Sequence, residues 1–448
     1  MTTPSRFHVA VTNLTVSGLA LAALLMAAPL SAQTRPPRPT GRVSFYTNVS
    51  RLAPTGEPGS LDADFITNAS YSLPDADGDG LEFGVDVRHA DYTNARRATR
   101  VSVYDGYVGG RFAGGHVRVR GGQMWLNDLG GLGSLAGGVV EFKQSPSTGG
   151  IGRLRLGAFG GVEPTTYQFG YVEGIRKFGG YATLEGSGGR RHVVGYIRQT
   201  HSQLVERSVV TASNFVPVRS KLFVYQASEY DLTGPAGQGR GGLSYFFVNA
   251  NASATSRLYL QGLYHRGRSI DARSITDDVL AGRPLREGAL DGLLYESAGG
   301  RVTVRALPDL RLSAGYSRDK NNRDSAATRR ITLGGSAGNV AASGVDATVS
   351  FSRIQRPTGE YDSLYVSVGR QLGRVVYLSG DYSTSVSILR FTRSDGIVIE
   401  TRPETHQLSV SSVVTLSRQV SLSCTMDRTR DDFSSDLRVL AGLTFRIR

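Results

Sequence analysis

The chain has 448 residues, enough for two or three soluble domains or for one large barrel. Its 56 glycines, 16 prolines and 40% hydrophobic residues, with no long apolar stretch of helical period, favour an all-β fold. The formal charge of +13 comes almost entirely from arginine. A basic exported protein can meet phosphate-rich lipid, anionic solutes or nucleic acid. Nucleic acid ranks last, because the chain has no basic run and no aromatic-basic motif.

Residues 1–32 have the pattern of a secretory signal peptide. Arg6 gives a positive start, Val16–Leu30 is apolar, and Ser31 and Ala32 precede a cleavage position before Gln33. We therefore expect export and removal of residues 1–32. Residues 33–40 carry three prolines, which fit neither a helix nor an inner strand, so they are expected to form an extended leader.

From residue 41 to residue 448, segments of alternating apolar and polar residues follow one another. The first are Arg42–Ser50, Asp62–Leu73, Leu81–Tyr92, Arg100–Phe112 and His116–Trp125. No run of about 20 apolar residues occurs after residue 40, so a chain that crosses a membrane here must do so as a closed barrel. The single cysteine, Cys424, excludes a disulfide framework and a thiolate metal cluster.

Three aspartates, Asp75, Asp77 and Asp79, stand at positions one, three and five of a calcium-loop pattern, with Gly80 at position six. Asp86 stands at position twelve, but Leu81–Val87 alternates like a strand and would hold Asp86 away from the loop. A turn rich in Gly and Asp between two strands explains the same residues and is the preferred interpretation. Calcium at these aspartates is the alternative, and no other cofactor is expected.

Arginine occupies polar positions of several predicted strands, each beside an apolar neighbour. In a membrane barrel the apolar neighbours face lipid, so these arginines face the lumen. Rings of arginine favour anionic solutes. If the arginines instead pair with lumen carboxylates such as Glu141 and Asp346, they only fill the interior of the barrel. Both interpretations stay open for Arg118, Arg120, Arg153, Arg155, Arg301, Arg305 and Arg311.

The segment Trp125–Gly138 is too apolar and too rich in glycine for an ordinary solvated loop. It is expected to fold into the lumen and to narrow it, with Trp125, Asn127 and Asp128 as candidate constriction residues. The alternative is a strand that continues through glycine bends.

Two later segments depart from simple strand alternation. Arg268–Asp291 is the longest polar connection, and Thr276, Asp277 and Asp278 could cap a short helix through Leu280. Ile388–Arg402 has a hairpin pattern that is expected to project from the barrel. Tyrosine and phenylalanine near strand ends suggest interfacial girdles: Tyr71, Tyr92, Phe112, Tyr264, Tyr295, Tyr316 and Tyr382.

Short connections alternate with longer ones along the second half of the chain, as in outer-membrane barrels. Short ones lie at Leu416–Gln419, Leu372–Arg374, Leu307–Asp309 and Ala254–Ser256, and longer ones include Arg430–Ser435 and Asn321–Thr328. Strands of roughly 9 to 13 residues match a tilted membrane crossing. We predict about 22 strands, with Thr166–Phe178 as an external excursion.

The last strand, Asp436–Arg448, alternates Leu437, Val439, Ala441, Leu443, Phe445 and Ile447 with mostly polar residues. Such a strand avoids aggregation by pairing with the first strand and closing the barrel. It resembles the closing strand of Gram-negative outer-membrane β-barrel proteins, although the usual terminal aromatic residue is replaced by Arg446-Ile447-Arg448. The resemblance implies a transmembrane antiparallel up-and-down barrel, in contact with outer-membrane lipid and lipopolysaccharide and inserted by the barrel assembly machinery.

Strands begin too early for a plug domain, which argues against a TonB-dependent receptor. The expected function is porin-like passive diffusion of small polar solutes, including anionic ones, through the lumen. A non-conducting envelope scaffold or export partner is one alternative, and a barrel-rim hydrolase with His265, or His201 near Glu206, is another. An enzyme is not expected, since the seven histidines are scattered and match no catalytic motif. The pattern specifies no oligomeric state.

Overall fold

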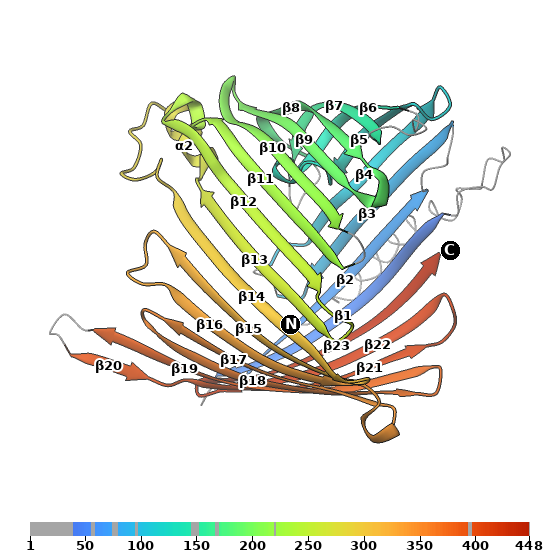
Figure 1. Ribbon diagram of the computed structural model, residues 1–448, viewed down its shortest axis with the longest axis vertical. Coiled ribbons are helices and arrows are strands. Elements are labelled where there is room, and N and C mark those ends of the chain that lie inside the picture. The colour runs from blue at the N-terminus through green and yellow to red at the C-terminus, as the bar shows by residue number, and fades with distance from the viewer. Residues whose placement is uncertain are drawn as a thin grey trace, which may run out of the picture.

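The computed structural model describes residues 39–54, 59–73, 79–94, 97–144, 152–165, 170–218, 221–392 and 397–447. Most of them belong to one antiparallel sheet that closes on itself (Figure 1). Each strand pairs with the next along the chain, and the last strand, β23 (Ser434–Ile447), pairs with the first, β1 (Thr40–Pro54). The predicted up-and-down barrel is therefore confirmed.

The other strands are β2 (Ser60–Leu73), β3 (Gly80–Tyr92), β4 (Arg100–Phe112), β5 (Val117–Trp125), β6 (Ser134–Lys143), β7 (Arg153–Pro164), β8 (Tyr171–Glu185), β9 (Arg191–His201), β10 (Leu204–Val218), β11 (Leu222–Thr233), β12 (Arg240–Ser253), β13 (Leu258–Ser269), β14 (Leu293–Leu307), β15 (Leu310–Asn321), β16 (Thr328–Ala337), β17 (Val345–Arg356), β18 (Gly359–Leu372), β19 (Val376–Thr392), β20 (Val398–Thr401), β21 (Glu404–Thr415) and β22 (Val420–Asp431). Within the described ranges, one α-helix, α2 (Ala272–Leu280), and four short 3-10 turns, η1 (Gly130–Leu132), η2 (Ser187–Gly189), η3 (Pro235–Gly237) and η4 (Val340–Ala342), lie in connections. Because β20 and β21 pair with successive parts of β19, the barrel has 22 strands.

The closing pair keeps the predicted two-faced pattern. Val43 lies opposite Phe445 and Val49 opposite Val439, so the apolar row of β23 continues on β1. Arg438 and Arg446 alternate with that row and point to the other face of the sheet. A shared apolar face fixes the register, because a slip of one residue would turn every apolar side chain toward the lumen.

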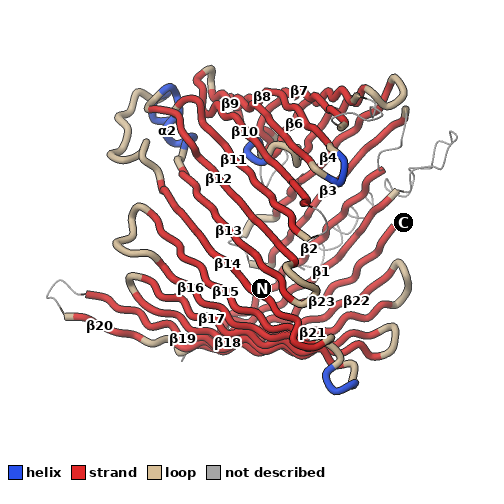
Figure 2. The backbone as a smooth tube through the Cα atoms, in the orientation of Figure 1, coloured by secondary structure: helices blue, strands red, loops and turns tan. Residues whose placement is uncertain are grey.

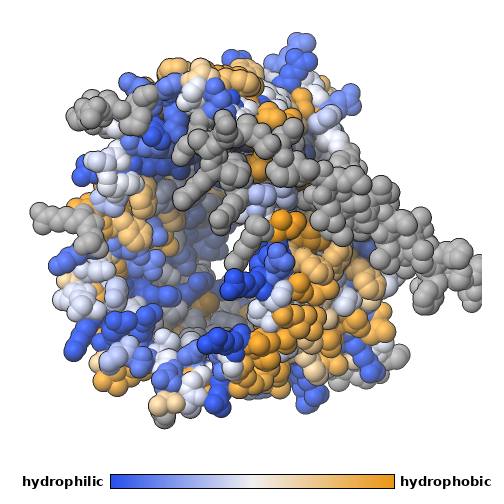
Figure 3. All heavy atoms as spheres, turned by 90° about the vertical axis from the view of Figure 1, so that its right-hand side faces the viewer, coloured by the Kyte–Doolittle hydropathy of each residue, from blue (hydrophilic) through white to orange (hydrophobic). Residues whose placement is uncertain are grey.

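The outer face of the barrel is apolar and the inner face is polar. On β17, for example, Val349 is exposed on the outside, while the neighbouring Thr348 and Ser350 point inward. Figure 3 shows that the molecule is hollowed at its centre, with hydrophilic residues around the hollow. Within the described residues, no helix has the length and hydropathy needed to cross a membrane. A closed sheet with an apolar exterior satisfies its backbone internally and can lie in lipid.

A charge placed on the lipid face should destabilise this barrel. We expect Val349→Arg to lower the free energy of unfolding by about 2–4 kcal/mol, the usual cost of arginine near the middle of the membrane. Ser350→Arg, one residue further on but facing the lumen, should change it far less. Urea unfolding in lipid vesicles measures both, and equal losses in the two variants would contradict the assigned faces.

The two ends of the barrel differ. The end with Thr40 and Ile447, here called the terminal end, carries the short turns at 254–257, 308–309, 373–375 and 416–419. The opposite end, here called the loop end, carries the long connection 270–292 and the β19–β20 hairpin (Figure 2). The asymmetry is weaker than predicted: β22 and β23 are joined by residues 432 and 433 alone, although Arg430–Ser435 was expected to be a longer connection.

Two further boundaries differ from those predicted. Thr166–Phe178 is not an external excursion as a whole, because β8 begins at Tyr171 and pairs with β7 and β9. The helix in the long connection begins at Ala272, with Asp271 as its N-cap: Oδ1 of Asp271 accepts a hydrogen bond of 3.1 Å from the Ser274 backbone N–H. Thr276 is buried inside the helix and does not cap it.

The described part of the chain from Thr40 to Ile447 consists of barrel strands and their connections, and it contains no separate plug domain. The signal peptide, residues 1–32, and all but residues 39 and 40 of the predicted leader lie outside the described residues. Asp75 and Asp77 also lie outside them. Those parts of the sequence analysis stay predictions.

Candidate functional site: the inner wall and its inward loop

The connection between β5 and β6, residues 126–133, folds into the barrel and is here called the inward loop. Leu126, Leu129 and Leu132 recur at every third position and are buried. The Leu129 backbone N–H donates to the Leu126 carbonyl (2.9 Å), and the Leu132 N–H donates to the Leu129 carbonyl (3.0 Å). The loop is therefore a compact turn that directs one apolar side toward the barrel wall.

These leucines pack on inward-facing apolar residues of several strands, including Val139 of β6, Phe159 of β7 and Val209 of β10. Full burial of each leucine contributes about 1.5–3 kcal/mol. Lys177 of β8 is buried and donates from Nζ to the Leu132 carbonyl (3.0 Å) and the Ser134 carbonyl (3.3 Å). The loop thus stays inside the barrel because its apolar side chains are buried there and its backbone carbonyls accept hydrogen bonds there.

A substitution at Gly195 of β9 tests this packing, because a β-carbon at that position would overlap Cδ2 of Leu129. We expect Gly195→Ala to lower the free energy of unfolding by about 1–3 kcal/mol, as overpacking does. Gly262→Ala on β13 is the matched control, since a β-carbon there would meet nothing within 4 Å. Urea unfolding of both variants is the measurement. Equal stability would mean that the loop does not press on β9.

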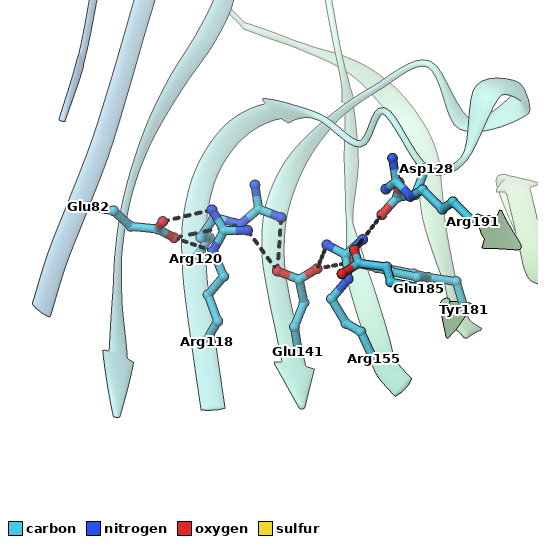
Figure 4. A network of polar contacts seen from close by, with 9 residues as sticks. All are labelled: Glu82, Arg118, Arg120, Asp128, Glu141, Arg155, Tyr181, Glu185 and Arg191. Atoms are coloured by element: carbon cyan, nitrogen blue, oxygen red, sulfur yellow. Dashed lines mark hydrogen bonds and ion pairs between the residues drawn. The ribbon is translucent and has the colours of Figure 1, made fainter. Parts of the chain in front are cut away.

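A network of charged side chains lies beside the inward loop (Figure 4). Arg118 makes a two-pronged contact with Glu82, with Nε–Oε1 and Nη2–Oε2 distances of 2.7 Å each. The carboxylate of Glu141 accepts from Arg118 (3.1 Å), Arg120 (3.4 Å) and Arg155 (3.1 Å). Both glutamates are almost completely buried. These distances are those of charge-assisted hydrogen bonds.

The network also holds the inward loop. Arg155 Nη2 lies 2.6 Å from Asp128 Oδ2, and Arg191 of β9 contacts the other oxygen of Asp128. Tyr181 donates its hydroxyl hydrogen to Glu141. With Glu185 3.9 Å from Arg155, four guanidinium groups meet four carboxylates. The network therefore carries no net charge, and its arginines contribute little to the potential inside the lumen.

Four of the arginines considered in the sequence analysis lie outside this network: Arg153, Arg301, Arg305 and Arg311. None of them has a carboxylate of the described residues within 4.0 Å. Arg305 of β14 and Arg311 of β15 lie directly opposite each other on the inner face. The buried Nε atom of Arg305 has no hydrogen-bond partner in the described part. Like charges in such a pair repel each other, so the site is suited to an anion.

The structure places the three candidate constriction residues differently. Asp128 lies in the inward loop and is bound by two arginines. Asn127 lies in the same loop and is exposed. Trp125 is the last residue of β5, half of it is exposed, and it lines a small inner-wall cavity together with Asn127 and Asp128. The inward connection is shorter than the predicted segment Trp125–Gly138, because Trp125 still belongs to β5 and Ser134 already begins β6.

The helix α2 folds toward the wall from the long connection at the loop end. Arg273 binds Glu206 of β10 (2.9 Å) and Glu163 of β7 (3.2 Å), and Asp277 lies 3.2 Å from Nδ1 of His201. Burial opposes the charge of Arg273, but hydrogen bonds and charge from Glu206 and Glu163 raise its pKa above the ordinary value. Sequence reasoning missed Arg273, because nothing in the local pattern links a loop residue to strands so far away in the chain.

The residues considered for catalysis or calcium are placed as follows. His201 is paired with Asp277, and His265 lies on the inner wall with its Nε2 3.3 Å from the Tyr295 hydroxyl. Asp79 accepts a 3.0 Å hydrogen bond from the Gly115 backbone N–H. The described residues contain no group of three His, Cys, Asp or Glu that could hold a metal ion. The calcium interpretation of Asp75, Asp77 and Asp79 stays a prediction.

The inner wall from β15 to β22 has a different composition and is here called the hydroxyl wall. Its inward positions alternate with exposed apolar residues such as Leu333, Val349 and Val410. The hydroxyls of Ser411 and Thr425 are 3.0 Å apart across β21 and β22. The wall consists mainly of Ser313, Ser317, Thr332, Ser336, Thr348, Ser350, Ser352, Ser363, Ser367, Ser379, Ser383, Ser409, Ser411, Ser423 and Thr425.

No protein-family model matches the chain, and no curated protein does. Solved structures resemble it at low sequence identity. OccAB4 of Acinetobacter baumannii is 9% identical with a TM-score of 0.44, over 91% of this chain and 98% of that one. OpdQ of Pseudomonas aeruginosa is 8% identical with a TM-score of 0.45, over 92% and 99%. A mutant of the ferric enterobactin receptor (PfeA) of Pseudomonas aeruginosa is 10% identical with a TM-score of 0.52, over 91% and 80%. The similarity to the receptor, whose TM-score is above 0.5, concerns the fold alone: the chain is a closed antiparallel β-barrel.

Proposed function

We propose that the protein is an outer-membrane channel through which small polar solutes diffuse passively, with a preference for anions. The observation that carries the proposal is the uneven inner wall. The inward loop and a neutral charge network occupy the side of β3 to β10, whereas the hydroxyl wall faces the lumen with small polar side chains. Such a wall binds solutes too weakly to trap them, as passage requires.

The anion preference rests on Arg301, Arg305 and Arg311. They face the lumen from β14 and β15, next to the hydroxyl wall, and no described carboxylate neutralises them. Arg118, Arg120 and Arg155 are lumen-facing as well, but Glu82, Glu141 and Asp128 compensate their charges. The selective charge is therefore assigned to the β14–β15 wall.

Planar-bilayer recording of the refolded mature chain, residues 33–448, tests the channel. Stable conductance steps are expected, and a salt gradient should give a reversal potential shifted toward that of chloride. A well-folded barrel that conducts nothing would contradict the channel and favour a scaffold or export partner. Steps with cation preference would contradict the assignment to Arg301, Arg305 and Arg311 alone.

The location of the protein in the outer membrane is part of the same proposal. Export with removal of residues 1–32, contact with lipopolysaccharide and insertion by the barrel assembly machinery are inferred from the signal pattern, the apolar outer face and the closing strand β23. His265 contacts the Tyr295 hydroxyl and His201 contacts Asp277 in the described structure, and no hydrolytic role is proposed for either.

A further inference from the structure

Aromatic side chains line the inner wall from β10 to β14, between the apolar cluster under the inward loop and the hydroxyl wall. Strand alternation places them on the lumen side, because their neighbours Val210, Val218 and Val302 are exposed on the outer face. Phe215, Phe223 and Tyr225 are each about two-fifths exposed. The set, here called the aromatic row, is Phe215, Phe223, Tyr225, Tyr245, Phe247, Tyr259, His265 and Tyr295.

Ring contacts link the aromatic row in two groups, and strand pairing brings the groups together, because Phe215 lies directly opposite Tyr225. Centroid distances are 6.1 Å from Phe215 to Phe223 and 5.9 Å from Tyr225 to Phe247. Phe247 stacks on Tyr245 at 6.5 Å with an interplanar angle of 8°. The row then continues through His265 to Tyr295, with centroid distances of 5.2 Å and 4.8 Å. A solute can thus move from ring to ring along one wall.

The aromatic row joins two cavities of the inner wall. One, of about 340 Å³ at the loop end, is lined by Tyr245 and Tyr295 together with Arg207 and Asp231. The other, of about 630 Å³ toward the terminal end, is lined by Phe215, Phe223, Tyr259 and Arg301. Both volumes are in the range of small-molecule sites. The row therefore leads from one end of the barrel toward the other.

The polar groups between the rings indicate which solute fits. Asn249 lies opposite Tyr225, and Asn251 lies opposite both Phe223 and Gln261, all on the inner face. Amide side chains both donate and accept hydrogen bonds without adding charge. A sugar ring presents an apolar face of C–H groups and a rim of hydroxyls. Asn251 Nδ2 donates to Asn249 Oδ1 (2.8 Å), and the remaining donor and acceptor positions of these amides are suited to the hydroxyls of a sugar, whose apolar face fits the aromatic rings.

We propose that the aromatic row is a binding track for saccharides, along which sugar rings stack as they pass through the channel. This inference rests on the proposed channel function and names a class of solute for it. The hydroxyl wall, which continues the inner surface beyond β14, offers further hydrogen-bonding groups to the hydroxyl rim of such a solute.

The test uses the refolded mature chain in planar bilayers, with a linear trisaccharide of glucose as the probe. We expect the trisaccharide to interrupt the ion current, and polyethylene glycol of equal mass to do so much less. Tyr225→Ala with Phe247→Ala should weaken the trisaccharide block about tenfold, because two stacking surfaces are lost. Phe246→Ala is the matched control, since Phe246 neighbours Phe247 on β12 but points outward and packs on Tyr264.

The possible results separate the two proposals. Salt conductance without trisaccharide block, or block that the double variant leaves unchanged, would overturn the saccharide track and leave the channel intact. Equal block by polyethylene glycol would show simple obstruction and would also overturn it. If the barrel conducts no salt, the channel proposal fails, and the trisaccharide is instead titrated into the folded protein in a calorimeter. A heat of binding that is present in the original protein and absent in the double variant supports the track. No heat of binding in the original protein overturns it.

Discussion

Glu141→Gln should lower the free energy of unfolding by about 3–5 kcal/mol, the cost of removing one partner from a buried ion pair. Glu141 is 2% exposed and faces Arg118, Arg120 and Arg155 at hydrogen-bonding distance. Glutamine keeps the shape of the side chain but removes the charge, so three guanidinium groups are left around a neutral amide. Urea unfolding in lipid vesicles, or the temperature at which the folded band disappears on gels, measures the loss.

Glu287→Gln is the control for this variant, because Glu287 is exposed in the long connection at the loop end. It should unfold like the original protein. If Glu141→Gln also unfolds like the original protein, desolvation offsets the attraction within the network, and the inward loop is held by its leucines and by Lys177.

Arg305→Gln combined with Arg311→Gln should reduce the anion preference of the channel. Two charges near a passing ion change its energy by about 1 kcal/mol after screening, so the chloride to potassium permeability ratio should fall about fivefold. The reversal potential in a salt gradient gives the ratio directly. The barrel itself should be at least as stable as before, because the facing arginines repel each other.

The same strands offer a matched control for the arginine pair. Arg318 of β15 and Arg329 of β16 also lie directly opposite each other, but on the outer face. Their double replacement by glutamine removes the same formal charge and should leave the permeability ratio unchanged. Equal shifts in both double variants would show that the preference follows total charge and not the lumen wall.

Most of the fold could be predicted from alternation, because a strand with one lipid face and one lumen face shows a period of two. Arg100–Phe112 was predicted with the bounds of β4, and β23 was expected to close on β1. Alternation fails where the inner face is covered. In β8, Lys177 is buried against the inward loop, and Glu173, Gly174 and Arg176 add polar or small residues, so the start of that strand was taken for an excursion.

The site was less predictable, because a period of two does not say which face is inside. Tyr295 was grouped with the interfacial aromatics, yet it points inward to His265. Tyr264 lies on the outer face beside Phe246, as its grouping with the interfacial aromatics requires. Which arginines are neutralised depends on carboxylates from other strands. Glu82 of β3 reaches Arg118 of β5 across β4, where Gly109 stands opposite Glu82 and has no side chain in the way.

The pairing of Gly41 with Ile447 also governs how the chain must fold. Contacts between residues so distant in sequence form slowly, since a very long loop must close before they contribute. Until β23 arrives, β1 and β22 both present unpaired backbone groups at open edges, and such edges invite pairing with other chains. A newly made chain therefore has to be kept from pairing with other chains until β1 and β23 meet. A chain truncated before Ser434 would lose the closure of the barrel, not merely one of its 22 strands.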